Sequence, residues 1–275
     1  MPPLSNRRRK AIARLRRRKH RQDQGRTLLE SRRALSAALD AGAPLVEVVV
    51  DADRQHEPGL YALLSRLAAE TSVPVHTADA DTLRQVTDVE TSQGVVAVVK
   101  TPLLDADAVP EALPDAAAVL VLDGVQDPGN VGTIVRTAAW FGADAVVAGP
   151  GTAGLYNPKV MRAAMGGHWD LACVRANGLG ALLDRLRRSG YALYGADLHG
   201  VRADVWQPER PSALVLGSEA HGLSVPVLDR LMHAVSIPGA TSRQGAESLN
   251  VAVASGILVY EWMGTGAGSA TPPAT

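Results

Sequence analysis

The sequence predicts an α/β protein, with a small N-terminal α/β unit followed by a parallel sheet that carries helices on both faces. Short, almost continuously apolar segments alternate with segments of helical period, as strands buried in a parallel sheet do. Residues 101–116 are rich in Pro, Asp and Ala, have no strong period and separate two such regions as a linker. The 275 residues suffice for one large domain or two ordinary ones.

Residues 1–24 are expected to form a basic, mobile arm with some helix propensity. The small unit spans residues 25–100. Its expected helices are 28–41, 59–70 and 81–86, and its expected strands are 45–50, 73–76 and 94–100. This alternation predicts one compact α/β unit.

The second unit is expected at residues 117–264, followed by a disordered tail at 265–275. Its expected strands are 119–123, 145–148, 171–174, 191–196 and 213–217. Its expected helices are 131–141, 158–165, 179–188, 225–234 and 248–262. Ligands of such sheets bind beyond the carboxyl ends of the strands, so the site is expected there.

Composition narrows the class of protein. Hydrophobic residues make up 46% of the chain, but no apolar run is long enough to cross a bilayer, so a soluble globular protein is expected. Cys173 is the only cysteine, which excludes an internal disulfide, provides no metal-ligand cluster and fits the reducing cytoplasm. No apolar secretory segment follows Met1. The arginine-rich start has the charge of a transit peptide, but it contains little serine and no clear cleavage context.

The zero net charge conceals an asymmetric distribution. Between Arg7 and Arg33 lie 13 basic and two acidic residues, which leaves 15 basic and 26 acidic residues elsewhere. Basic segments commonly bind polyanions, because neutralised phosphates release counterions; the alternative is a solvated helix or solubilising tail. Aromatic residues are too scarce for a base-stacking platform, so phosphate contacts and shape would provide the affinity. The candidate phosphate contacts are Arg7, Arg8, Arg9, Lys10, Arg16, Arg17, Arg18 and Lys19.

Polar residues follow three of the apolar segments. Asn130 is a natural N-cap after the strand at 119–123, and Arg136 lies six residues on, where it could clamp a phosphate or polarise a hydroxyl; a capped helix with a solvent-facing Arg is the alternative. Glu219 directly follows the strand at 213–217, although a carboxylate there is more often a cap than a catalyst. Ser248 and Asn250 are residue types that prefer the open end of a helix, where free N–H groups attract anions.

Several common signatures are missing. The sequence has no Gly-x-Gly-x-x-Gly after the first strand of the second unit, no phosphate-loop Lys, no His-Glu-x-x-His and no Ser nucleophile elbow. The residues alone therefore predict an α/β enzyme with a small-molecule cleft and a polyanionic partner.

Together, the three stretches resemble the motifs of the SpoU/TrmH family of RNA ribose 2′-O-methyltransferases, within the SPOUT class. The matching motifs, in chain order, are Asn130-x-Gly132-Thr133-x-x-Arg136, Leu216-Gly217-Ser218-Glu219-x-x-Gly222-Leu223, Ile237-Pro238 and Glu247-Ser248-Leu249-Asn250-Val251-x-Val253-Ala254. The resemblance covers residues 117–263. The small unit is similar to the family's substrate-binding domain through Leu29-Glu30-Ser31 and Gln93-Gly94-Val95. The segment between Pro238 and Glu247, which includes residues 241–244, is longer than is typical.

The resemblance implies a C-terminal trefoil knot that holds S-adenosylmethionine, and a homodimer whose active sites take residues from both subunits. It implies that Gly217, Ile237 and Leu249 line the cofactor. It also implies that the ribose is surrounded by Asn130, Arg136, Glu219, Ser248 and Asn250. Arg162 is a possible second phosphate contact; an exposed helix arginine is the alternative. No metal is implied.

The implied reaction displaces the sulfonium methyl group by a ribose 2′-hydroxyl, which the protein must align and relieve of a proton. Arg136 is expected to orient the hydroxyl and the adjacent phosphate, with the proton leaving to Arg136 or to water. Bacterial 23S ribosomal RNA is the first expected substrate and transfer RNA the second. A non-catalytic RNA-binding or ribosome-assembly protein is the competing class, and a base methylase is disfavoured by the motif residues.

Overall fold

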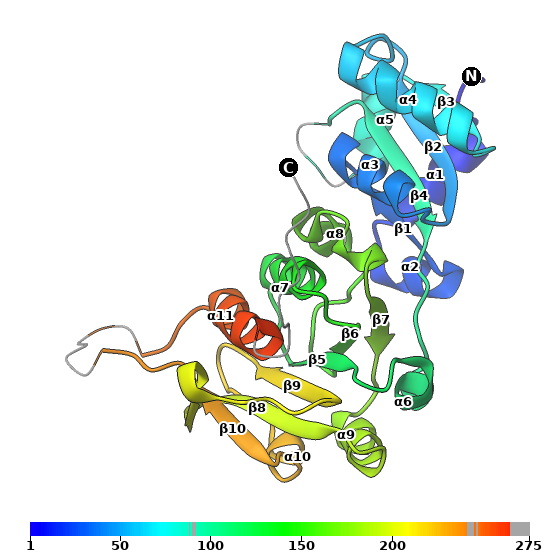
Figure 1. Ribbon diagram of the computed structural model, residues 1–275. Helices are drawn as coiled ribbons and strands as arrows, with labels where there is room; N and C mark the ends of the chain where they lie inside the picture. The colour runs from blue at the N-terminus through cyan, green and yellow to red at the C-terminus, as the bar shows by residue number, and fades with distance from the viewer. Residues whose placement is uncertain (88, 90–91, 241–244, 246, 265–275) are drawn as a thin grey trace. The chain divides into compact units, whose positions relative to one another are not determined.

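The computed structural model describes residues 1–87, 89, 92–240, 245 and 247–264. The chain folds into two compact units (Figure 1). The first comprises residues 1–102 and 156–169, and the second comprises residues 103–155 and the described residues from 170 onward. Segment 156–169, which lies between two strands of the second unit, thus packs with the first unit. No helix among the described residues is long and apolar enough to span a membrane.

The first unit is built on a four-stranded sheet in the order β1-β4-β2-β3. Its strands are β1 (Arg26–Leu29), β2 (Leu45–Asp51), β3 (Val75–Ala78) and β4 (Val95–Lys100). β4 is antiparallel to both of its neighbours, and β2 pairs parallel to β3. The helices that connect these strands are α3 (Arg32–Asp40), α4 (Pro58–Glu70) and α5 (Ala80–Val86). The alternation predicted from the sequence is present, with one added strand.

That added strand corrects the prediction of a helix over residues 28–41. Leu28 and Leu29 belong to β1, and the helix α3 begins only at Arg32. The Ser31 hydroxyl accepts a hydrogen bond from the backbone N–H of Ala34 at 3.1 Å, which caps the helix at that point. Before the cap, β1 pairs with β4 and buries its leucines.

The prediction of a mobile N-terminal arm is wrong. Residues 1–24 contain α1 (Asn6–Arg14) and α2 (Arg18–Gln24), and α1 packs against α5. Ile12 and Leu15 are 1% and 2% exposed and join the core of the first unit. Burying a side chain of that size contributes about 1.5–3 kcal/mol, which opposes the entropy of a free arm. The two apolar residues, rather than the many cations, decide the structure of this segment.

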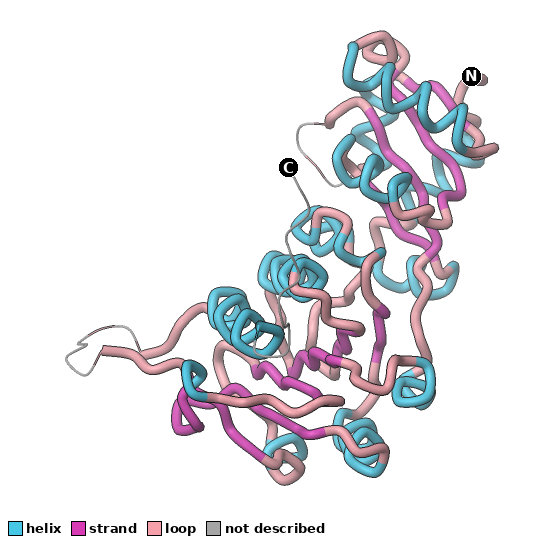
Figure 2. The backbone as a smooth tube through the Cα atoms, in the orientation of Figure 1, coloured by secondary structure: helices cyan, strands magenta, loops and turns pink. Residues whose placement is uncertain are grey.

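The second unit has a six-stranded, entirely parallel sheet in the order β10-β8-β9-β5-β6-β7, which confirms the predicted sheet (Figure 2). Its strands are β5 (Ala118–Asp123), β6 (Ala145–Ala148), β7 (Ala172–Arg175), β8 (Ala192–Arg202), β9 (Ser212–Gly217) and β10 (His233–Ser236). Every residue of the central strand β5 is buried, as expected of a strand covered on both faces.

Helices cover both faces of this sheet (Figures 1 and 2). Two of them, α7 (Pro128–Trp140) and α11 (Val251–Gly264), pack together on one face. The other face carries α6 (Val109–Ala112), α9 (Leu179–Arg188) and α10 (Val225–Leu228). The remaining helix, α8 (Pro158–Ala164), belongs to the first unit. The predicted linker contains α6, whose Val109 is buried in the core.

Two further predictions about the second unit are corrected by the structure. The helix expected over residues 225–234 ends at Leu228, and Ala234 lies in β10, where it pairs with β8. β8 is longer than predicted, and its pairing with β10 shifts register between Ala234 and Val235, so residues 196–200 leave the ladder. The predicted tail at 265–275 and residues 241–244 of the predicted long loop lie outside the described residues.

Candidate functional site

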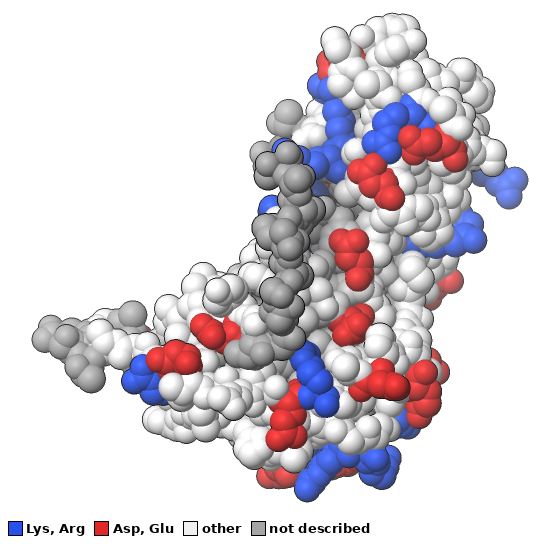
Figure 3. All heavy atoms as spheres, in the orientation of Figure 1, with Lys and Arg blue, Asp and Glu red and all other residues white. Residues whose placement is uncertain are grey.

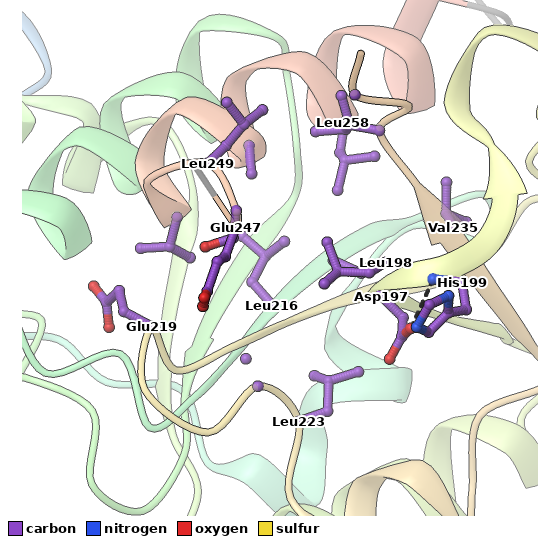
Figure 4. Close-up of a pocket in the computed structure, with 18 of the residues that line it drawn as sticks. Asp197, Leu198, His199, Leu216, Glu219, Leu223, Val235, Glu247, Leu249 and Leu258 are labelled. Atoms are coloured by element: carbon purple, nitrogen blue, oxygen red, sulfur yellow. Dashed lines mark hydrogen bonds between the residues drawn. The ribbon is translucent and has the colours of Figure 1, made fainter. Parts of the chain in front are cut away.

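The second unit contains a pocket of about 680 Å³ at the carboxyl ends of β9 and β10 and beside the start of α11 (Figure 4). Four chain segments line it, within residues 196–199, 216–223, 235–240 and 247–258. Parallel strands place their ligands at this edge because the loops that follow neighbouring strands converge there. The sequence predicted a site at this position.

The three residues predicted to hold a cofactor all line this pocket: Gly217, Ile237 and Leu249. Gly217 ends β9, and a Cβ atom added to it would lie 2.2 Å from the backbone carbon of Gly222. Ser218 and Gly222 exchange backbone hydrogen bonds of 3.0 and 2.9 Å, so the chain folds back tightly on itself. Only glycine fits at position 217 without displacing this loop.

Three of the predicted ribose-surrounding residues form one hydrogen-bonded chain. The side-chain N–H of Asn130 donates to Glu219 Oε1 at 2.6 Å, and the side-chain N–H of Asn250 donates to Asn130 Oδ1 at 3.2 Å. These residues come from α7, the loop after β9 and the start of α11. The two hydrogen bonds therefore join residues that are far apart in sequence, by 89 positions in the first bond and 120 in the second.

Asn250 also fixes the direction of this chain. Its Oδ1 accepts the backbone N–H groups of Ala252 at 2.9 Å and Val253 at 3.3 Å, and so caps α11. With the oxygen committed to the helix, the amide nitrogen is directed at Asn130. The sequence indicated Ser248 and Asn250 together for this helix end, and the structure gives the cap to Asn250.

Asn130 itself is not the N-cap that the sequence predicted. Asp127 caps α7, because its Oδ1 accepts the backbone N–H of Asn130 at 2.9 Å and Pro128 occupies the first helical position. Asn130 therefore lies inside the first turn, and its side chain is available to Glu219.

Asp123 was missed as a positioning residue. This carboxylate ends β5, is 8% exposed, and accepts the backbone N–H of Ser224 at 2.6 Å. It thereby ties the end of the loop that carries Gly217 and Glu219 to the central strand. The available signal was an acidic residue at the end of an otherwise apolar strand.

Arg136 and Ser248 have different positions. Ser248 lines the pocket and is exposed. Arg136 is also exposed, but it does not line the pocket of its own chain, and it forms no hydrogen bond or ion pair within the part of the chain that the structure describes. The predicted catalytic set is thus only partly assembled in one chain.

Acidic residues that sequence reasoning missed also face the pocket. Glu247 lies beside Glu219 at one end, and Asp197 and His199 lie at the other end (Figure 4). Asp197 Oδ1 accepts the backbone N–H of His199 at 2.9 Å, within the segment that leaves the β8 ladder. Neither Lys nor Arg is among the described residues that line the pocket. Three carboxylates between leucine side chains favour a cationic ligand with apolar parts.

The candidate RNA contacts fall into two groups. Within the first unit, Arg8 Nη1 donates to Glu47 Oε2 at 2.9 Å, Arg9 donates to the Gln85 side chain, and Arg162 pairs with Glu30, whose side chain is fully buried. Arg162 is therefore not an exposed helix arginine, the alternative that the sequence left open. Arg8 nevertheless stays exposed, with 48% of its side chain accessible. The remaining candidates are also exposed: Arg7, Lys10, Arg16, Arg17, Arg18 and Lys19. Among the described residues, no cluster of His, Cys, Asp and Glu could hold a metal ion.

Comparisons with known families agree with this architecture. Residues 117–260 match the model of the SpoU rRNA Methylase family, and residues 6–97 match the MRM3-like substrate binding domain. The second match includes α1 and α2, in agreement with their packing on the first unit.

Individual relatives give the same result. The chain is 39% identical to the 23S rRNA (guanosine(2553)-2′-O)-methyltransferase RlmP of Bacillus subtilis, over 71% of this chain and 75% of the relative. It is 32% identical to the 23S rRNA (uridine(2479)-2′-O)-methyltransferase of Streptomyces viridochromogenes, over 86% and 82%.

Solved structures are similar along nearly the whole chain. A putative RNA methyltransferase of the TrmH family from Porphyromonas gingivalis has a TM-score of 0.80 and 31% identity, over 94% of this chain and 98% of that one. The SpoU methyltransferase AviRb from Streptomyces viridochromogenes, in complex with the cofactor AdoMet, has a TM-score of 0.80 and 29% identity, over 94% and 97%.

Proposed function

Because the chain belongs to the SpoU rRNA Methylase family, we propose that it transfers a methyl group from S-adenosylmethionine to a ribose 2′-hydroxyl of bacterial 23S ribosomal RNA. The observation that carries this proposal is the hydrogen-bonded chain of Asn130, Glu219 and Asn250 beside the pocket. It joins one polar residue from each of the three motifs. The enzyme would act in the cytoplasm.

The pocket residues suit S-adenosylmethionine. Gly217, Ile237 and Leu249 would hold the cofactor, and the leucine-lined walls suit its adenine ring. Its sulfonium and ammonium groups are cations, which the carboxylates of Glu219, Glu247 and Asp197 would attract. When bound, the cofactor supplies an activated methyl group.

The chemistry assigned to the protein is alignment and proton removal. The 2′-oxygen would form a bond to the methyl carbon as the carbon–sulfur bond breaks, and the hydroxyl proton would leave to water or to Arg136 in its neutral guanidine form, since a guanidinium has no acceptor. Asn130 and Glu219 provide a fixed donor and acceptor beside the ribose. Ser248 and Asn250 come from the segment directly before α11. Arg136 orients the hydroxyl and the neighbouring phosphate, a geometry that a guanidinium suits well.

The active unit would be a homodimer formed through α7 and α11. Their outer faces leave large apolar side chains exposed, with Trp140 82%, Tyr260 59% and Val253 53% exposed. A second copy that covered this face would bury them. Arg136 lies one helical turn before Trp140, so the same docking would bring Arg136 to the partner's pocket and complete its catalytic set.

We also propose that the C-terminal end of this unit forms a trefoil knot. Two features support it. β10 and β9 lie on opposite sides of β8, and α11 returns to pack on α7 and β9. Close backbone passages at Gly200 and Gly217, where an added Cβ would lie 2.3 and 2.2 Å from other backbone atoms, fit a tightly threaded chain.

The test is methyl transfer from labelled S-adenosylmethionine to unmodified bacterial ribosomal RNA and, separately, to bulk transfer RNA. Label in 23S RNA that makes one linkage resistant to alkali supports the proposal, because a 2′-O-methyl group blocks cleavage. Label only in transfer RNA would overturn the substrate while keeping the reaction. No label in ribosomal RNA, transfer RNA or ribosome-assembly particles, despite cofactor binding, would favour a non-catalytic RNA-binding protein.

A further inference from the structure

The first helix of the first unit separates its cations between two faces. Arg8 and Arg9 are directed at the body of the unit, where they bond to Glu47 and Gln85. Arg7, Lys10 and Arg14 are spaced by three and four residues, which places them together on the other side of α1. All three of these residues are exposed. In Figure 3, basic side chains project from the edge of the first unit where Figure 1 places α1 and α2.

Contacts of Arg8 with two nearly buried side chains fix the rotation of this helix about its axis, although the Arg8 side chain itself is 48% exposed. Arg8 Nη1 lies 2.9 Å from Glu47 Oε2 and 3.1 Å from His76 Nε2, and the side chains of Glu47 and His76 are 11% and 9% exposed. Ile12, one turn further along, is buried on the same side. The helix is therefore held with Arg7, Lys10 and Arg14 directed outward.

The outward face is uniformly positive. α1 contains no acidic residue, and Asp23 is the first acidic residue of the chain. Among the described residues, no hydrogen bond or ion pair engages the side chains of Arg7, Lys10 or Arg14. At a rise of 1.5 Å per residue, these cations are spread over about 10 Å of helix axis. A row of fixed, unneutralised cations matches the repeating negative charge of a nucleic-acid backbone.

We propose that α1 is a rigid phosphate-binding surface for the RNA substrate, in which Arg7, Lys10 and Arg14 contact backbone phosphates and Arg8 is a positioning residue that does not touch RNA. This proposal rests on the proposed function, since it takes the partner to be structured RNA. It adds Arg14 to the RNA-binding residues and removes Arg8 and Arg9 from them. Because the helix is already ordered, binding would not require the ordering entropy of a mobile arm.

The main experiment measures the affinity for an unmodified 23S RNA fragment as a function of salt concentration. The Arg7→Ala/Arg14→Ala variant should reduce the slope of log affinity against log salt by about 1.5, because each lost phosphate contact removes about 0.7–0.9. Alanine favours helix, so α1 should stay folded, which circular dichroism verifies. The matched control is Arg187→Ala/Arg188→Ala, which removes two exposed arginines from α9 and should leave the slope unchanged.

Single variants test the division of roles within α1. Arg14→Ala should lower the slope by about 0.8, whereas Arg8→Ala should leave it unchanged while amide hydrogen exchange in α1 becomes faster. An unchanged slope in the Arg7/Arg14 variant, or an equal loss in the α9 control, would overturn the proposal. The proposal would also be overturned if binding to anionic phospholipid vesicles depended on Arg7 and Arg14 while RNA binding did not depend on them.

The result is separable from the proposed reaction. If the slope falls as expected but no RNA is methylated, the phosphate-binding surface stands and the catalytic proposal fails. If methylation proceeds with the same salt dependence in wild type and variant, the reaction stands and this surface is excluded. Cofactor affinity should be the same in all four variants, because α1 and α9 do not line the pocket.

Discussion

The side-chain nitrogen of Asn250 lies 3.2 Å from the side-chain oxygen of Asn130, while the oxygen of the same Asn250 amide caps α11. One side chain thus joins the start of the last helix to α7, and through Asn130 to Glu219. The amide suits this position because it has both a donor and an acceptor. An aspartate could cap the helix but could not donate to Asn130.

Asn250→Asp should therefore separate stability from catalysis. The cap is kept, so the free energy of unfolding should change little, whereas Asn250→Ala should lose about 1 kcal/mol through the missing cap. Both variants should lower single-turnover methyl transfer at least 10-fold, because Asn130 loses the bond that orients it. Urea unfolding and rapid-quench methyl transfer measure the two effects. Full activity in Asn250→Asp would show that its donated hydrogen bond has no part in the reaction.

Mixing two inactive variants tests whether Arg136 acts in the partner's site. Arg136→Ala and Glu219→Ala should each abolish transfer, and Arg136→Ala should keep cofactor binding. After the subunits are exchanged, half of the dimers should be mixed and carry one complete site, which restores about a quarter of wild-type activity. Absence of recovery, with mixed dimers confirmed by mass spectrometry, would place Arg136 in the site of its own chain.

Gly217→Ala should prevent cofactor binding. The added methyl group would meet the backbone of Gly222 at 2.2 Å, and backbone atoms cannot rotate away as a flexible side chain can. The loop would have to open, and Glu219 would move with it. Calorimetric titration with S-adenosylmethionine measures the loss. Gly154→Ala is the control, since a Cβ atom at that position meets nothing within 4 Å. The affinity of this variant for S-adenosylmethionine should equal that of wild type.

The pair formed by Arg162 and Glu30 should contribute mainly to stability. The Glu30 side chain is fully buried, so Arg162→Ala would leave its carboxylate without this cation and destabilise the first unit by about 3 kcal/mol. Adding Glu30→Gln to that variant should recover part of the loss. Chemical unfolding measures both changes. If Arg162 instead binds phosphate, Arg162→Ala would keep its stability and reduce the salt dependence of RNA binding.

Glu57 should make the stability of the first unit depend on pH in acid. Hydrogen bonds from Arg54 and then from Arg32 lower the pKa of this carboxyl from 4.5 to about 2. Because the pKa is lower in the folded state than in the unfolded state, the stabilisation is complete above pH 4.5 and is lost as the pH falls towards 2. Wild type and Glu57→Gln should thus differ in urea midpoint at pH 6 and converge near pH 2. A constant difference would contradict this assignment.

Much of the second unit could be predicted from the sequence, since strands covered on both faces consist of continuous apolar runs. The bounds of β6 and α9 were predicted to the residue. Errors arose where a few local bonds decide the outcome. Ser31 delays the start of α3, and Asp127 rather than Asn130 caps α7. In the N-terminal segment, two buried apolar residues outweighed a pattern dominated by cations.

The sequence by itself determined the parallel α/β sheet, the three motif segments and the placement of a site at their ends, because apolar runs and helical periods are patterns of residues close in the chain. It could not determine which side chains of those segments meet. Tertiary structure alone joined Asn130 to Glu219 and Asn250, aimed Asp197 and Glu247 at the pocket, and directed Arg8 inward but Arg14 outward. The reason is physical. The bonded residues lie 89 positions apart in one pair and 120 positions apart in the other. Whether they meet depends on how the sheet brings the loops together, which no local sequence pattern encodes.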